Sequence, residues 1–368
     1  MVPFADPLAI RPLDSPQFTK KDLDRLPRSH ALVAFDHEHG RCVQLLSTAD
    51  ARELARTRLI AGDGPARADL SQVTHALRVW PARCSLEADL LYARLAPELL
   101  GDRSDELRRP SAIFLLSADE HAPHPRFRTV SSLDTPPASR LTGPFTTRKR
   151  AEQFADDLID LFDLCRKHEL LVLAPDATAC VYKELGKCPA ACDGSESLEA
   201  YKSRFTEALA LAQAHPEIAL LELHAKMNDA SASLEYELAE KLRARLARVT
   251  KLRQEPNRLV SDIRSSVWLA LSKCADQKSV YAALMRGGHV VSELAFSRPT
   301  SPAECTRSIL DAKQPTRPDG PHLPAIELIT RRFAKPGPSD VARLFVLASD
   351  DACDLEAALT VFLALAGE

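Results

Sequence analysis

The sequence has few aromatic residues, few glycines and little net charge. Aromatics make up 5% of its 368 residues, glycine occurs 12 times, and the formal net charge is −3. Abundant Ala, Leu and Arg with little glycine favours a helix-rich chain. A nearly neutral chain lacks the overall positive charge typical of many nucleic-acid-binding proteins. Basic residues cluster only in short runs, which we interpret as solvated helix faces: 148–150, 243–251 and 331–332.

Long apolar runs and the common catalytic motifs are also missing. No stretch approaches the roughly 20 apolar residues of a membrane helix, and no cleavable signal segment is evident. We therefore expect a soluble, cytoplasmic protein without a membrane partner. The sequence contains no Walker-type phosphate loop, GxGxxG, HExxH or serine elbow. Its length suits two or three domains.

Four of the nine cysteines lie within residues 165–192. Seven residues separate Cys180 from Cys188 and three separate Cys188 from Cys192, a spacing that lets thiolates from adjoining turns face one ion or cluster. Cys165 ends the helix-like run AEQFADDLIDLFDLC. The alternative is that these are ordinary buried thiols, but their flanks are Lys, Gly, Pro and Asp. Disulfides are not expected without a signal segment, and the other five cysteines are scattered.

The N-terminal third alternates strand-like and helix-like patterns. Residues 1–26 are rich in Pro and Asp without periodicity, and we interpret them as a loosely ordered leader that can pack on the body and has no assigned function. ALVAFDHEHGRCVQLLS then predicts a hairpin, ADARELARTRLI a helix, THALRVWPA a strand and SLEADLLYARLAPELLG a second helix. Residues 27–105 are therefore expected to form a small α/β domain.

The remainder predicts four further segments, which makes the whole an α+β, helix-rich multidomain chain. Residues 106–142 are expected to form connecting strands, and 143–216 a helical cysteine region whose first helix is capped by Thr147. In residues 217–252 a serine patch at 231–233 interrupts an apolar stripe, which suits two helices folded as a hairpin. Residues 258–368 predict an α/β domain with a meander and a helix capped by Ser301 or Thr300.

The cysteine segment carries a specific resemblance. CVYKELGKCPAACDG, followed by an acidic residue, Tyr201 and a long charged helix, resembles the cysteine segment of the bacterial excision-repair endonuclease subunit UvrC and its shorter homologue Cho. In that family the four cysteines hold a [4Fe-4S] cluster. The resemblance implies that Cys165, Cys180, Cys188 and Cys192 are its ligands, although the first gap is longer than usual. Zinc is the fallback, because four thiolates suit either.

The front of the chain resembles the family's GIY-YIG nuclease domain in layout but not in its chemical residues. Aligning the motifs puts Gln44 where the second strand should carry a tyrosine. Leu54 is the ungapped match to the family's helical arginine, and a slip of one or two residues brings Arg52 or Arg56 into place. The nuclease domain is therefore expected to be degenerate.

The second helix of that domain lacks the family's metal-binding glutamate. Glu87-Ala88 matches a Glu-Ala pair of the family, which leaves Tyr92 at the glutamate position. Phosphodiester hydrolysis requires a divalent ion such as Mg²⁺ or Mn²⁺ held by charged oxygen ligands, and tyrosine is a neutral phenol at pH 7. Glu87 is the only nearby carboxylate that we consider as a substitute, and we interpret it as a structural helix residue.

Residues 217–252 resemble the UVR motif through which UvrB and UvrC meet. The family's Leu-x-Phe-Glu core corresponds to the run from Leu234 to Glu237, with Tyr236 as the aromatic residue, and its Leu-Arg pair corresponds to Leu242 and Arg243. The resemblance implies that these side chains bind a UvrB-like partner. The alternative is a hairpin that packs within its own chain, on the cysteine region.

The resemblance covers most of residues 30–368 and stops before the family's ribonuclease-H-like domain, as in Cho. We expect a UvrC/Cho-like protein of nucleotide excision repair whose incision chemistry is degraded and which docks on UvrB or on DNA. Two alternatives remain open: a metal-dependent endonuclease that cuts 3′ of a lesion with residues such as Arg56 and Glu87, and a redox-sensing regulatory protein. A separately encoded exonuclease of the proofreading type is a further possible partner.

Overall fold

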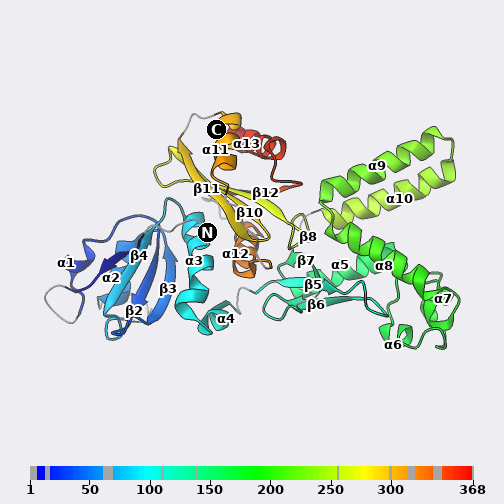
Figure 1. The fold of residues 1–368 in the computed structure, drawn as a ribbon, viewed down its shortest axis with the longest axis horizontal. Helices are drawn as coiled ribbons and strands as arrows, with labels where there is room; N and C mark the ends of the chain where they lie inside the picture. Colours follow the sequence, from blue (N-terminus) through cyan, green and yellow to red (C-terminus); the bar gives the residue numbers. More distant parts are fainter. Residues whose placement is uncertain are drawn as a thin grey trace. The chain divides into compact units, whose positions relative to one another are not determined.

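The computed structural model describes residues 6–12, 17–60, 69–108, 112–136, 139–254, 257–297, 301–313, 320–334 and 342–366. The chain divides into two compact units (Figure 1). The first combines residues 1–111 with residues 267–368, and the second consists of residues 112–266. Both units contain helices and an antiparallel sheet, so the expected α+β, multidomain architecture is confirmed.

The N-terminal part of the first unit comprises β1 (Leu8–Ile10), α1 (Lys20–Leu23), β2 (Ala31–Asp36), β3 (Cys42–Thr48), α2 (Ala51–Leu59), β4 (Ala76–Pro81), α3 (Ser85–Leu100) and α4 (Arg103–Arg108). Its strands form an antiparallel sheet in the order β1-β4-β2-β3. Successive strand residues point to opposite faces. Val33 packs with the buried side of α2, and Ala34 with that of α3. The two helices therefore cover opposite faces, and the predicted order of hairpin, helix, strand and helix is confirmed.

The described residues of the segment expected to be a loosely ordered leader pack on this domain, as the sequence allowed, and they form regular elements there. β1 is an edge strand that pairs with β4, with Leu8 opposite Val79. Ile10, Phe18 and Leu23 are buried in the core beneath α2. Their irregular spacing gave no periodic signal, because the burial comes from a sheet edge and a helix that other parts of the chain provide.

The C-terminal part of the first unit comprises β9 (Val267–Lys273), β10 (Ser279–Arg286), β11 (His289–Ser297), α11 (Pro302–Asp311), α12 (Leu323–Ala334), β12 (Ala342–Leu347) and α13 (Ala352–Ala366). The sheet order is β11-β10-β9-β12, and α11 and α13 share one apolar core with it. The predicted meander is confirmed. Gly288 has φ +80°, and a Cβ there would lie 2.6 Å from the carbonyl oxygen of His322. Ser301 caps α11 in a capping box with Glu304, and Thr300 lies outside the described residues.

The second unit contains β5 (Phe114–Ala118), β6 (Phe127–Ser131), β7 (Arg140–Phe145), α5 (Arg148–Leu161), α6 (His168–Leu171), α7 (Val181–Glu184), a 3-10 turn (Ala191–Asp193), α8 (Leu198–Gln213), α9 (Pro216–Ala232), α10 (Tyr236–Arg253) and β8 (Ser261–Asp262). Its sheet has the order β6-β5-β7-β8. α5 and α8 share one core with it. Thr147 caps α5 as predicted, accepting the N–H of Arg150 at 3.3 Å.

The structure groups the segments of this second unit more closely than the sequence suggested. β7 begins within the segment expected only to connect, residues 106–142, and ends inside the expected cysteine region. The connecting strands, the cysteine region and the hairpin therefore form one compact unit. Among the residues that the structure describes, no helix combines the length and the apolar character needed to cross a membrane.

Candidate four-cysteine centre and helical hairpin

A turn after α5 presents Cys165. Arg204 of α8 holds this turn: its Nε donates to the carbonyl of Phe162 at 3.0 Å, and its Nη2 donates to that of Asp163 at 3.2 Å. The same guanidinium forms an ion pair with Glu196. The Cys165 thiol donates to the Lys167 carbonyl at 3.3 Å. Arg204 is therefore a positioning residue for the first cysteine, and nothing in the cysteine spacing singles it out.

The other three cysteines lie on the loops around α7 and the 3-10 turn. Cys180 is the residue before α7, and Cys192 lies inside the 3-10 turn, where its carbonyl accepts the N–H of Ala177 at 3.0 Å. Lys183 of α7 ties these loops together, because its Nζ lies 2.6 Å from a carboxylate oxygen of Asp193. The loops thus hold each other in place through main-chain and charged contacts, as is usual where apolar core is scarce.

The thiols interact with each other electrostatically. Cys165 and Cys188 share a hydrogen bond, which, together with burial, raises the pKa of Cys165 far above its ordinary value. Accepting this bond, with help from nearby Arg204 and Arg166, lowers the pKa of Cys188 to about 6. Burial raises the pKa of Cys192, and nearby charges, Cys188 and Cys180 among them, raise it further. The structure therefore brings Cys165 and Cys188 into contact, with Cys180 and Cys192 on neighbouring loops.

The described residues contain no closed single-ion site. In the part of the chain that the structure describes, no three His, Cys, Asp or Glu side chains gather closely enough to hold one metal ion. All four cysteines are free thiols, and Cys188 and Cys192 are buried.

The tip of the α9–α10 hairpin exposes apolar side chains. Figure 1 shows the two helices lying side by side, and the break predicted at 231–233 is confirmed, because α9 ends at Ala232. Leu234 is 69% exposed and Tyr236 is 67% exposed. Leu234 also has φ +61°, a left-handed conformation that an L-residue with a branched side chain adopts only at a cost. An exposed leucine in a strained turn requires an explanation beyond local stability.

The other two residues expected to bind the partner lie further along α10. Leu242 is half-buried, whereas Arg243 is exposed and pairs with Glu240 at 2.9 Å. The apolar stripe is therefore divided: Leu246 faces inward, and the tip residues face solvent.

The base of the hairpin is anchored to the body of the second unit. Arg253, 4% exposed, donates to the carbonyls of Val260 at 2.7 Å and of Leu211. Burial lowers its pKa to about 10. The alternative of packing on the cysteine-bearing body is thus correct for the base of the hairpin, while the tip remains uncovered.

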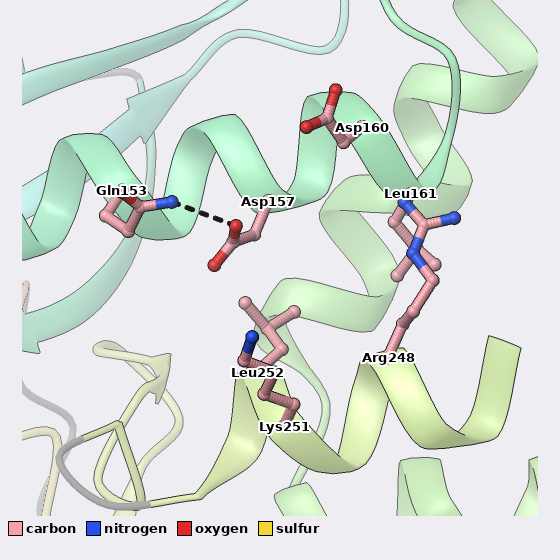
Figure 2. A pocket seen from close by; sticks show the side chains of 7 residues that line it. All are labelled: Gln153, Asp157, Asp160, Leu161, Arg248, Lys251 and Leu252. Carbon is pink, nitrogen blue, oxygen red and sulfur yellow. Dashed lines mark hydrogen bonds between the residues drawn. The ribbon is translucent and has the colours of Figure 1, made fainter. Parts of the chain in front are cut away.

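A pocket of about 380 Å³ lies between α5 and the base of α10. Figure 2 shows Asp157 and Asp160 on α5 and Arg248 and Lys251 on α10, so opposite charges line the two sides. Arg248 and Lys251 are exposed, as expected of a solvated face in the basic run at 243–251, and they line the pocket opposite α5.

The degenerate nuclease positions do not form one cluster. Gln44 pairs with Phe35 across β2 and β3, which puts it on the face covered by α2. Within the described residues its Oε1 is buried without a hydrogen-bond partner. Arg56, on α2, forms an ion pair with Asp24 at 2.5 Å. Tyr92 lies on α3, across the sheet from both.

Glu87 is held by Arg83, whose side chain and backbone N–H both donate to it at 2.6 Å. This agrees with its interpretation as a structural residue. A second carboxylate on α3, that of Asp89, lines a pocket together with Tyr92. Arg332 of α12 pairs with Asp89 at 2.7 Å and is 13% exposed, so the basic pair at 331–332 is not simply a solvated face.

Two models of known families match parts of the second unit. Residues 113–211 match the model described as UvrC/Cho excinuclease, middle domain, and residues 217–252 match the UvrB/uvrC motif. The first match contains strands β5, β6 and β7 of the second unit's sheet and the four cysteines, and the second match coincides with the hairpin. Together they define a class of protein with an excinuclease-type middle domain followed by a UvrB/UvrC-type hairpin.

Several curated relatives share this part of the chain. UvrABC system protein C of Anaeromyxobacter dehalogenans (strain 2CP-C) is 24% identical over 293 residues, which cover 77% of this chain and 41% of the relative. The protein of the same name from Leptospira biflexa is 26% identical over 157 residues, or 43% of this chain and 26% of the relative. The protein of that name from Methylobacillus flagellatus is 30% identical over 157 residues, which cover 42% of this chain and 26% of the relative.

Over residues 113–211 and 217–252, the chain is similar to the UvrC/Cho-like excision-repair family. It spans between about a quarter and two fifths of the length of these relatives. No solved structure matches it.

Proposed function

We propose that this protein acts in nucleotide excision repair as a docking factor, which binds a UvrB-like partner through the hairpin tip and holds a [4Fe-4S] cluster at its four cysteines. It does not incise DNA itself. The observation that carries the proposal is the exposed, strained tip formed by Leu234 and Tyr236 within the matched motif. Apolar residues uncovered at the end of an anchored hairpin gain most by pairing with a second apolar surface.

The donor set supports an iron–sulfur cluster at the cysteine centre. Four thiols suit either a cluster or zinc. The resemblance of the cysteine segment to that of UvrC, together with the match of residues 113–211 to the UvrC/Cho middle domain, supports the cluster. The cluster would be held by Cys165, Cys180, Cys188 and Cys192. It would supply a rigid, redox-capable cross-link between loops with little apolar core of their own.

The residues around this centre would stabilise its charge. Thiolate ligands are anionic, and the cations that already lower the pKa of Cys188 are Arg204 and Arg166. Arg204 additionally fixes the turn before Cys165. Such surrounding hydrogen bonds and charges orient ligands and tune a cluster.

Loss of incision is supported by the arrangement of the N-terminal domain. Hydrolysis would require a metal-binding carboxylate and its partners on one face. Arg56 and Glu87, the pair considered for an active enzyme, lie on helices that cover opposite faces of the sheet, and each already has an ion-pair partner.

The test combines binding and cleavage in one reaction. Purified protein, a UvrB-like partner and a lesion-bearing duplex are incubated with Mg²⁺ or Mn²⁺, and complex formation and strand cuts are measured together. We expect a stable complex without 3′ incision. Incision that Glu87→Gln abolishes would establish the active-endonuclease alternative, and absence of any complex would refute the docking role. Oxidant-dependent cluster loss without partner or DNA binding would instead favour a redox sensor.

A further inference from the structure

A second pocket lies between α3 and α12, within the first unit, whereas both candidate sites belong to the second. Its volume is about 420 Å³, within the range typical of small-molecule sites, roughly 300–1,000 Å³. It exists because α3 presents two alanines, Ala93 and Ala96, where larger side chains would fill the space between the helices. The residues that line it are Asp89, Tyr92, Ala93, Ala96, Pro324, Glu327, Leu328, Arg331 and Arg332.

The chemistry of the pocket changes from its floor to its rim. Ala93, Ala96 and Leu328 provide an apolar surface beside the half-buried ring of Tyr92. Glu327, 2% exposed, brings a carboxylate into the interior. Arg331 is exposed and therefore lies where the pocket meets solvent. The pocket therefore has a cation at its mouth, and apolar side chains and carboxylate oxygens inside.

The remaining charged residues fix the walls. Arg332 donates from Nη1 to Asp89 at 2.7 Å and from Nη2 to the Ser85 hydroxyl at 2.7 Å. Ser47 of β3 donates to the other oxygen of Asp89 at 2.9 Å. These bonds join α3, α12 and β3, so the pocket is preformed, and the exposed Arg331 lies at its mouth.

We propose that this pocket binds a single nucleotide. The base would occupy the apolar space with its face against Tyr92, its exocyclic amino group would donate to Glu327, and its phosphate would pair with Arg331. Aromatic side chains stack on any base, and arginine forms charge-assisted bonds to phosphate. Carboxylates inside the pocket accept from the amino groups of adenine, cytosine or guanine, which thymine lacks. This inference goes beyond the proposed docking function and does not depend on the hairpin or the cluster.

The test measures equilibrium binding of dAMP to the full chain by calorimetry, with deoxyadenosine and inorganic phosphate as separate probes. We expect saturable dAMP binding, about tenfold weaker binding of deoxyadenosine, and weak binding of phosphate alone. dTMP should bind more weakly than dAMP. Tyr92→Ala should weaken dAMP about tenfold, since one stacking contact is lost.

Two variants separate the pocket from other surfaces. Leu328→Trp fills the space and should abolish dAMP binding, and Arg331→Gln should remove the advantage of dAMP over deoxyadenosine. Arg307→Gln, an exposed arginine on α11, is the matched control and should leave binding unchanged. If Leu328→Trp lowers the melting temperature, Arg331→Gln decides alone. The inference is overturned if dAMP fails to bind at millimolar concentration, if phosphate binds as tightly as dAMP, or if the decisive variants bind dAMP like wild type.

Discussion

The backbone N–H of Glu235 donates to the carbonyl oxygen of Ala230 across 2.9 Å. With the bond from Leu234 N–H to Ser231 at 3.1 Å, this closes a Schellman cap at the end of α9, in which Leu234 is the left-handed residue. Glycine is the residue that such a position normally favours. Leucine here therefore costs stability and leaves an apolar side chain at the hairpin tip.

Replacing this leucine should separate stability from binding. We expect Leu234→Gly to raise the free energy of unfolding of the hairpin by about 1 kcal/mol, because glycine adopts this conformation without strain. The same change should weaken binding of a UvrB-like partner at least tenfold, since the apolar contact is lost. Thermal melting and calorimetry measure the two effects. Leu221→Ala, an exposed position on α9 away from the tip, is the control; equal binding by Leu234→Gly and wild type would contradict the docking role.

Cluster binding should depend on the four cysteines of the centre and on no other. Anaerobically purified protein should be brown, with iron and sulfide in equal amounts. Cys180→Ala should lose most of the visible absorbance, whereas Cys353→Ala, which removes an exposed cysteine outside the centre, should keep it. A colourless protein with one zinc ion per chain would reject the cluster while retaining the ligand set.

The anchoring arginine should matter for the stability of the second unit. Arg253→Met removes charge-assisted bonds to buried carbonyls and leaves these oxygens without their donor. We expect a loss of about 2–4 kcal/mol in the free energy of unfolding. Chemical denaturation followed by circular dichroism measures it. Arg243→Met, at an exposed site on the same helix, should leave stability unchanged; a similar loss in both variants would argue against a special role of the anchor.

The two parts of the first unit should unfold together. Arg94 of α3 pairs with Glu293 of β11 at 2.9 Å, and the Tyr281 hydroxyl donates to the same carboxylate at 2.7 Å. Arg94→Ala leaves Glu293 largely buried without its cation, so we expect a loss of about 3–5 kcal/mol. In the wild-type protein, limited proteolysis should cut the N-terminal and C-terminal parts of the first unit at the same denaturant concentration. Separate transitions for the N-terminal and C-terminal parts would contradict this cooperation.

Local patterns in the sequence predicted most elements but few of their long-range contacts. The β2–β3 hairpin, the cap at Thr147 and the break near 231–233 follow from alternation, capping chemistry and an interrupted stripe, all of which are local signals. The pairing of Arg332 with Asp89 has no local signal, because the two residues are far apart in the chain and each is compatible with a solvated helix face.

For the candidate site, too, the sequence predicted some residues and missed others. Spacing and resemblance identified the four cysteines, whereas Arg204 and Arg253 were missed. Both bond mainly to main-chain carbonyls, and no side-chain pattern encodes such a partner. Sequence reasoning also placed Gln44 and Tyr92 in one degenerate site, although strand alternation sends Gln44 to the face of the sheet opposite α3.

The first unit is built from two stretches of chain that are synthesised at different times, residues 1–111 and 267–368. α3 leaves the ribosome about 220 residues before α12, the helix that packs against it. At about 5–20 residues per second, that separation corresponds to roughly ten to forty seconds. During this interval the middle unit can fold, while the side of α3 that α12 later covers stays open. We therefore expect the protein to need a chaperone most during synthesis, after α3 has formed and before α12 covers it.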